Sequence, residues 1–125
     1  MEMAFYRCNE SGNIIIDVKR NEAPSECFQN MEKLVPNTVD AAKEKHVPVV
    51  VLTENAAKVS VGSVAHPMAA GHYIQWILLE LKNGYQIRYL NPGDAPACVF
   101  PIQKGDEVIA VYEYCNLHGL WKTSV

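Results

Sequence analysis

The sequence predicts a mainly β protein built around an antiparallel β-sandwich. From residue 48 onward, short apolar segments with strand character alternate with turn residues at the spacing that is typical of a sandwich. The segment HYIQWILLELKNGYQIRYL holds two of these runs around Asn83-Gly84, a dipeptide that favours tight β-hairpins. Bulk composition agrees, because 49% hydrophobic and 20% charged residues over 125 positions indicate one ordinary globular domain with a core of its own.

Residues 1–36 are predicted to form a small N-terminal β subdomain. The segment FYRCNESGNIIIDVKR indicates a hairpin, in which Cys8 precedes a turn at residues 11–13 and residues 14–18 form a strand. The segment that follows is rich in turn residues. So short a piece has too few apolar residues for a stable core, and we expect that it packs on the main domain, residues 37–125, or that it once needed a metal.

The main domain is predicted to begin with a short helix and to continue in strands. Thr38 would cap a helix over residues 41–45, and the Val47-Pro48 pair would end it, because a residue before proline disfavours helix. The segment KVSVGSV alternates as a half-buried strand does. DEVIAVYEYC is the expected final strand, with three residues on one face: Val108, Ala110 and Tyr112.

Charge and patterning exclude several functional classes. A net charge of −3 gives no indication of binding to nucleic acid or to an anionic membrane. No apolar run approaches the ~18 residues that a membrane span needs. The start, MEMAFYRCNESG, lacks the basic and apolar regions of a signal peptide, so we expect a cytoplasmic protein. In a reducing cytosol the four cysteines are thiols or metal ligands rather than a disulfide framework.

All four histidines fall in loops or at strand edges, and one cysteine falls beside them. A β-sandwich gathers its loops at its ends, so these segments can converge without distorting the sheets. A C-x-x-H pair by itself is a weak signal, for which ordinary turn residues are the commoner explanation. The placement of every histidine in such a loop is what favours a metal site. The candidate ligands are His46, His66, His72, Cys115 and His118.

The size of this ligand set favours iron. Structural zinc takes four ligands, mostly thiolates, and five are too many for it. Blue copper uses two histidines and one cysteine with a weak axial group, which would leave two histidines unexplained. Five ligands leave one octahedral position open, and this suits iron that meets a small ligand. A cupredoxin-like electron-transfer protein and a domain with a structural metal are the alternatives.

Four segments resemble the desulfoferrodoxin and superoxide reductase family: NTVDAAKEKHVPVV, KVSVGSVAHPMAAGHYIQWI, NPGDAPACVF and EYCNLHGLW. The resemblance covers nearly the whole chain. It implies an immunoglobulin-like sandwich that holds one mononuclear non-heme iron and reduces superoxide to hydrogen peroxide by one electron. It also implies the iron ligands, with four equatorial histidines and one axial thiolate: His46, His66, His72, His118 and Cys115.

The resemblance assigns roles to the pair that precedes the first histidine. Lys45 would attract superoxide, and Glu44 would bind ferric iron as a sixth ligand after turnover. Outside this family context, both are solvated residues at the end of a helix. The family further implies rubredoxin or a similar small redox protein as electron donor, and a homodimer.

The N-terminal subdomain departs from the family pattern. Many members bind a second iron there through four cysteines, in a C-x-x-C pair and an adjacent C-C pair. Here the first pair reads Cys8 and Ser11, and the second reads Glu26 and Cys27. Two of four thiolates are missing, so we expect one iron per chain and none in this subdomain. A residual metal site and a disulfide between Cys8 and Cys27 under oxidising conditions stay open.

Overall fold

The chain divides into two compact units, Met1–Val35 and Pro36–Val125, in a computed structural model that describes residues 3–18 and 29–125. Both units are built from antiparallel strands, which confirms the predicted mainly β fold. In the described part of the first unit, three strands form a sheet in the order β2-β1-β3. Their bounds are Ala4–Cys8 for β1, Ile14–Asp17 for β2 and Met31–Lys33 for β3.

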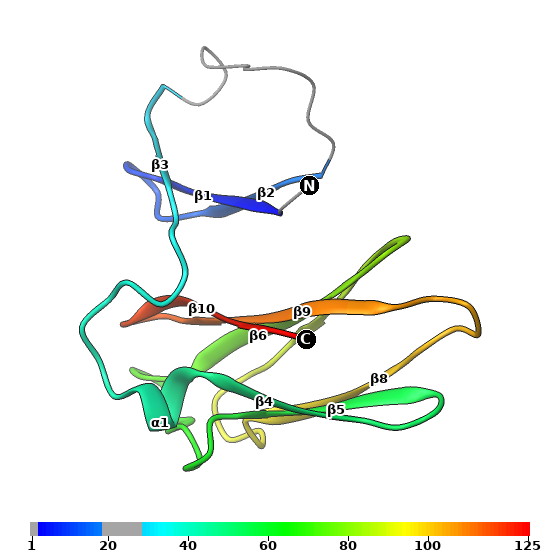
Figure 1. Cartoon of the computed structure of the whole chain (residues 1–125). Helices are drawn as coiled ribbons and strands as arrows, with labels where there is room; N and C mark the ends of the chain where they lie inside the picture. Colours follow the sequence, from blue (N-terminus) through cyan, green and yellow to red (C-terminus); the bar gives the residue numbers. More distant parts are fainter. Residues whose placement is uncertain (1–2, 19–28) are drawn as a thin grey trace. The chain divides into compact units, whose positions relative to one another are not determined.

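The second unit is a sandwich of two antiparallel sheets (Figure 1). One sheet has the order β10-β9-β6-β7, and the other has the order β4-β5-β8. β6 and β7 form the predicted hairpin, with Leu81 opposite Gly84. The strands are β4 (Pro48–Leu52), β5 (Ala56–Val61), β6 (Ile74–Leu81), β7 (Gly84–Tyr89), β8 (Ala97–Pro101), β9 (Val108–Cys115) and β10 (Gly119–Ser124).

The core of the sandwich lies between the two sheets. On β5 the alternation that the sequence shows places Val59 and Val61 inside, and Ile77 and Leu79 of β6 are buried in the same cluster. Each such side chain contributes roughly 1.5–3 kcal/mol by leaving water. Cys115, the last residue of β9, belongs to this cluster. One candidate ligand is therefore fixed by the core itself.

The helix is shorter than predicted. α1 covers Lys43–His46, its N-cap is Ala42, and no side chain caps it, so Thr38 is not its cap. The chain before α1 is instead held along β10, because the side chain of Asn37 accepts a hydrogen bond from Lys122 N at 2.9 Å and donates one to Lys122 O at 3.1 Å. No helix in the described residues is long and apolar enough to cross a membrane.

The sequence predicted β9 as the final strand, and this is wrong, because β10 follows it. The turn at residues 116–118 leads from Cys115, the last residue of β9, into β10, and β10 pairs with β9 from Gly119 opposite Cys115 onward. Gly119 has a φ of 77°, a backbone conformation that favours glycine, and this lets the chain reverse immediately after His118. The motif that raised the metal hypothesis is therefore a hairpin turn between two paired strands.

The face predicted for β9 is also wrong. Val108 belongs to the core cluster together with Val111, whereas Ala110 and Tyr112 do not. The register between β9 and β6 shifts near the end of β6, and this irregularity breaks the simple alternation of sides.

Gly62 holds the end of β5 against the backbone that precedes His46. A Cβ atom at Gly62 would lie 2.5 Å from the carbonyl oxygen of Glu44. That oxygen accepts hydrogen bonds from Val64 N at 2.9 Å and from the Ser63 hydroxyl at 3.3 Å. Three consecutive residues after β5 therefore contact the backbone of α1 at Glu44, and only glycine fits at the first of these positions.

We predict that Gly62→Ala lowers the free energy of unfolding by about 1–3 kcal/mol, because the added methyl group meets rigid backbone. Urea denaturation followed by circular dichroism measures this loss. Gly71→Ala is the matched control, since a Cβ atom there has nothing within 4 Å. Equal effects of the two substitutions would contradict the close contact.

Candidate metal centre

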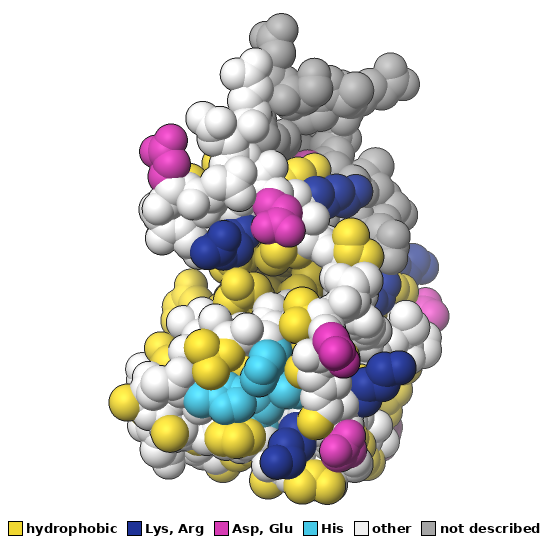
Figure 2. All heavy atoms as spheres, turned by 90° about the vertical axis from the view of Figure 1, so that its left-hand side faces the viewer, with side chains coloured by type: hydrophobic (Ala, Val, Ile, Leu, Met, Phe, Trp, Pro, Cys, Tyr) yellow, Lys and Arg dark blue, Asp and Glu magenta, His cyan; other side chains and the backbone are white. Residues whose placement is uncertain are grey.

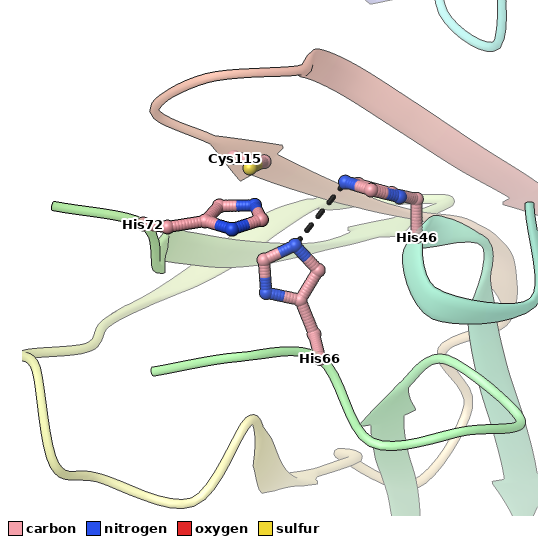
Figure 3. A group of neighbouring side chains, drawn as sticks. All are labelled: His46, His66, His72 and Cys115. Atoms are coloured by element: carbon pink, nitrogen blue, oxygen red, sulfur yellow. Dashed lines mark hydrogen bonds between the residues drawn. The ribbon is translucent and has the colours of Figure 1, made fainter. Parts of the chain in front are cut away.

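Five candidate ligands converge at one end of the sandwich, each beside an element that fixes its backbone. One histidine ends α1, two lie in the segment between β5 and β6, the cysteine ends β9, and the last histidine lies in the turn before β10. Ligand atoms of four of them lie within 4.8 Å of one another: His46, His66, His72 and Cys115 (Figure 3). His118 joins them through its ring contacts.

The four imidazoles form a closed ring. In the order His46, His66, His72, His118, successive ring centroids lie 4.6, 4.7 and 5.0 Å apart, and 4.8 Å separates the last from the first. Neighbouring planes cross at angles between 78° and 86°. Across the ring, the centroids of His46 and His72 are 6.4 Å apart. Each imidazole therefore stands nearly perpendicular to its neighbours and can turn one nitrogen toward a common centre.

Two of these nitrogens face each other as lone pairs. His46 donates from Nδ1 to the carbonyl of Ala42 at 2.7 Å, and His66 donates from Nδ1 to the carbonyl of Pro67 at 2.6 Å. In neutral rings these bonds leave both Nε2 atoms without a proton, and the two atoms are only 3.1 Å apart. Two imidazole ligands at right angles, about 2.1 Å from one ion, would be about 3.0 Å apart. The spacing fits a shared metal.

Burial keeps these rings neutral and available to a metal. Desolvation lowers the pKa of His46, and it lowers that of His66 to about 4, although the hydrogen bonds to backbone carbonyls act in the opposite direction. Desolvation also lowers the pKa of His72, followed in size by the charges of His118 and Lys45. At neutral pH the rings therefore present lone pairs rather than positive charges.

The other two imidazoles complete the set. The buried Nε2 of His72 has no hydrogen-bond partner among the described residues. Nδ1 of His118 lies 3.0 Å from Nε2 of His46 and 3.9 Å from Sγ of Cys115. A buried nitrogen without a partner costs free energy. A metal ion at the centre of the ring would bind this nitrogen and remove that cost.

The cysteine is fully buried beside this ring, with Sγ 3.9 Å from Nδ1 of His118. Burial raises the pKa of the Cys115 thiol, and hydrogen bonds from the backbone N–H groups of Leu117 and His118 lower it. A bound cation favours the deprotonated sulfur that these N–H groups would then stabilise. Four imidazoles and one thiolate fit iron better than calcium or magnesium, which prefer oxygen ligands.

A buried carboxyl group behind the cysteine was not anticipated. Glu113 is fully buried, and neither of its oxygens has a partner among the described residues. Burial therefore raises its pKa well above the usual range and keeps it protonated. Its position in the strand, two residues before Cys115, was the available signal, because period-two alternation puts both side chains on the inner face.

The side chain of Trp121 contacts two of the candidate ligands, His46 and His118. Trp121 is fully buried and stacks on His46, with ring centroids 4.9 Å apart and an angle of 29°. Its indole N–H donates to the carbonyl of His118 at 3.1 Å. The tryptophan that ends the motif EYCNLHGLW therefore holds one ring by stacking and the turn of another by a hydrogen bond.

The histidine cluster reaches the surface on one side, where hydrophobic side chains surround it (Figure 2). Leu117 in the Cys115–His118 turn and Val64 before His66 are half exposed or more, at 59% and 50%. Glu44 and Lys45, the predicted pair, lie exposed on α1 directly before His46. The site is therefore closed by the core on the thiolate side and open on the opposite one.

The N-terminal candidates are only partly described. Cys8 is half-buried, and its pKa is lowered first by a hydrogen bond from the side chain of Ser11. Glu26 and Cys27 lie outside the described residues, so the expected loss of the second iron site stays a prediction.

Comparison with known proteins agrees with this geometry. The family model for desulfoferrodoxin matches residues 38–124. The chain is 48% identical to a desulfoferrodoxin of Syntrophotalea carbinolica, over 98% of this chain and 96% of that protein. Among solved structures, it is similar to the superoxide reductase from Treponema pallidum, with a TM-score of 0.80 and 38% identity over 99% of this chain and 100% of the other.

A second solved structure matches part of the chain. The superoxide reductase (1Fe-SOR) from Giardia intestinalis aligns with a TM-score of 0.56 and 31% identity, over 66% of this chain and 98% of that one. The family model, the full-length identity and the shared fold together show that the chain belongs to the desulfoferrodoxin family.

Proposed function

We propose that this protein is a superoxide reductase that converts superoxide to hydrogen peroxide at one mononuclear iron. The observation that carries the proposal is the closed ring of four imidazoles beside a buried thiol, open to the surface on one side. The similarity to solved superoxide reductases supports it. The proposed iron ligands are His46, His66, His72, His118 and Cys115.

When bound, iron would supply the one electron that superoxide takes up as it gains two protons and becomes hydrogen peroxide. His46, His66 and His72 would hold the metal without adding charge, since desolvation lowers the pKa of each and favours the neutral ring. The thiolate of Cys115 would donate electron density from the buried side and favour release of the product. The exposed side is where an anion can approach.

Lys45 and Glu44 would act from the rim of the site. Lys45 is exposed, and its charge contributes to the lowered pKa of His72, so its field already reaches the ligand ring. We infer that it attracts the superoxide anion. Glu44 lies beside it with its backbone gripped by Val64 and Ser63, and its carboxylate would close onto the oxidised metal after turnover.

The donor set argues against the two alternative functions. A blue-copper carrier needs two imidazoles, one thiolate and a weak axial group, and would leave two rings of this site unused. A structural zinc would take four ligands in a closed tetrahedron. Here four rings surround one centre, each nearly perpendicular to its two neighbours, with one side open to the surface.

The two units would differ in function. We propose that residues 37–125 form the iron domain and that residues 1–36 keep a desulforedoxin-like fold without metal, since Ser11 and Glu26 stand where thiolates are needed. The cytoplasmic location and the homodimer stay predictions.

The electron donor would be rubredoxin or a similar small redox protein. Such a partner must come close to the metal, and the half-exposed Val64 and Leu117 beside the open side of the site offer it an apolar contact. This assignment rests on the family resemblance, and the exposed rim is consistent with it.

We predict that Cys115→Ser removes the thiolate charge-transfer colour of the ferric protein and most of its reductase activity, because a hydroxyl is a poorer electron donor than a thiolate. His66→Ala should mainly weaken iron retention. Visible spectra, iron analysis and superoxide decay measure these effects. Cys98→Ser serves as control, since Cys98 lies on β8 away from the ring. Full colour and activity in Cys115→Ser would refute the proposed axial ligand.

We predict that Lys45→Ala slows the reaction with superoxide about tenfold, or ~1.4 kcal/mol in barrier, with iron content unchanged. The rate should also fall less steeply with added salt, because a screened attraction is gone. Pulse-generated superoxide decay at several ionic strengths is the measurement. Lys43→Ala is the matched control, since Lys43 is an exposed lysine on the same helix. An unchanged rate and salt slope in Lys45→Ala would contradict its role.

We predict that Glu44→Ala affects the protein differently from Lys45→Ala. Capture of superoxide should stay nearly unchanged, since a negative side chain does not attract an anion, whereas the spectrum of the resting ferric protein should shift. A slower capture with an unchanged ferric spectrum would speak against the sixth-ligand role.

We predict that the fully loaded protein carries one iron per chain, because two of four sulfur ligands are missing from the N-terminal pattern. Metal analysis of iron-reconstituted protein gives the ratio, and the visible spectrum shows whether a four-sulfur iron is present. A reproducible ratio near two, with such a spectrum, would overturn this prediction.

A further inference from the structure

We propose that Asn116 is a positioning residue for the metal centre. Its side-chain amide clamps the backbone on both sides of His72 and ties it to the turn that carries Cys115 and His118. The proposal rests on the proposed function only in that these residues are taken as iron ligands.

Three hydrogen bonds form the clamp. The side-chain oxygen of Asn116 accepts from Tyr73 N at 2.9 Å, and its side-chain nitrogen donates to the carbonyl of Gly71 at 3.1 Å. Its own backbone N–H donates to the carbonyl of Tyr73 at 3.2 Å. The residues immediately before and after His72 are therefore both held by one side chain.

The sheet register explains why an amide side chain is needed here. Cys115 lies opposite Ile74 at the end of the β6–β9 ladder. Beyond this pair, β9 turns away toward His118, and the ladder can no longer satisfy the backbone around His72. An asparagine side chain carries the same donor and acceptor as a peptide group, so Asn116 continues the pairing across the turn.

His72 needs this support more than His46 and His66 do. His46 and His66 are each oriented by a bond from Nδ1 to a backbone carbonyl. For His72 no such carbonyl contact is present among the described residues, and its buried Nε2 is unpartnered. Its backbone pairs within its own loop, with Ala69, at 3.0 and 3.1 Å. Without the clamp, nothing comparable would fix the direction in which this ring points.

The clamp also couples two kinds of ligand. Asn116 directly follows Cys115, so a change in its side chain would act on the sulfur of Cys115 and on the imidazole of His72 together. Partners that orient metal ligands typically contribute 10–100-fold to metal affinity or activity. Loss of the clamp should therefore show both in how firmly iron is held and in the electronic spectrum of the thiolate.

Two substitutions separate the halves of the clamp. Asn116→Ala removes donor and acceptor, whereas Asn116→Asp keeps the acceptor for Tyr73 N–H and puts a carboxylate against the carbonyl of Gly71. In metal-free protein, hydrogen exchange at Tyr73 N–H should become faster in Asn116→Ala and stay slow in Asn116→Asp. In loaded protein, iron loss to a chelator should be about tenfold faster in Asn116→Ala, and faster than wild type in Asn116→Asp.

The ferric spectrum distinguishes positioning from general stability. The thiolate charge-transfer band should shift in Asn116→Ala while the midpoint of urea unfolding moves little. Asn83→Ala is the matched control, because Asn83 is an exposed asparagine whose side chain also donates a hydrogen bond, to Asp106, at the opposite end of β6. It should leave exchange at Tyr73, iron loss and the band unchanged. If Asn116→Ala does not fold, the Asn116→Asp results decide alone.

Failure of this proposal and failure of the proposed function give different results. Unchanged exchange at Tyr73 in Asn116→Ala, with wild-type iron loss and band position, would overturn the clamp even in an active reductase. Faster exchange and faster iron loss in a protein whose wild type does not consume superoxide would uphold the clamp and refute the function.

Discussion

The structure depends on one constraint: unprotonated ring nitrogens must be held face to face. Nε2 of His46 lies 3.1 Å from Nε2 of His66. Without a cation between them the lone pairs of these two atoms repel, so this contact does not stabilise the protein by itself. Bonds to the carbonyls of Ala42 and Pro67 hold the first two rings in place. The metal-free arrangement of these rings thus lowers the stability of the fold, and only a bound metal ion makes it favourable.

The sandwich provides the rigidity for this arrangement because every ligand adjoins a paired or packed element. Cys115 ends a strand inside the core cluster. His46 ends a helix that Gly62 brings against the end of β5, with no room for a side chain between them. His118 lies in a two-strand turn that Gly119 makes possible. A site assembled from such positions tolerates little movement, which suits a metal whose ligand directions matter.

The candidate ligands that the structure brings together could be picked out from the sequence, and the residues that support them could not. Histidine and cysteine in C-x-x-H and H-x5-H spacing are chemically conspicuous, and their place in loops follows from strand patterns. The short helix was misplaced, because Thr38 is a good cap by residue type while Asn37 holds the preceding chain along β10. β10 was missed, because GLWKTS is short and its pairing with β9 is a tertiary property. Asn116 looks like an ordinary turn residue until the register opposite it is known.

The polarity of the site follows from which side of the ligand ring is buried. The candidate thiolate ligand, Cys115, lies in the core cluster, where burial raises the pKa of the nearby Glu113 carboxyl and disfavours a second negative charge. Desolvation lowers the pKa of His46, His66 and His72, and the charge of the exposed Lys45 lowers that of His72 further. A divalent ion with one thiolate would carry a net charge of about +1, beside half-exposed apolar side chains such as Val64 and Leu117. Under the proposed function, an anion would approach from the exposed side of the ring, whereas Cys115 is buried in the core cluster.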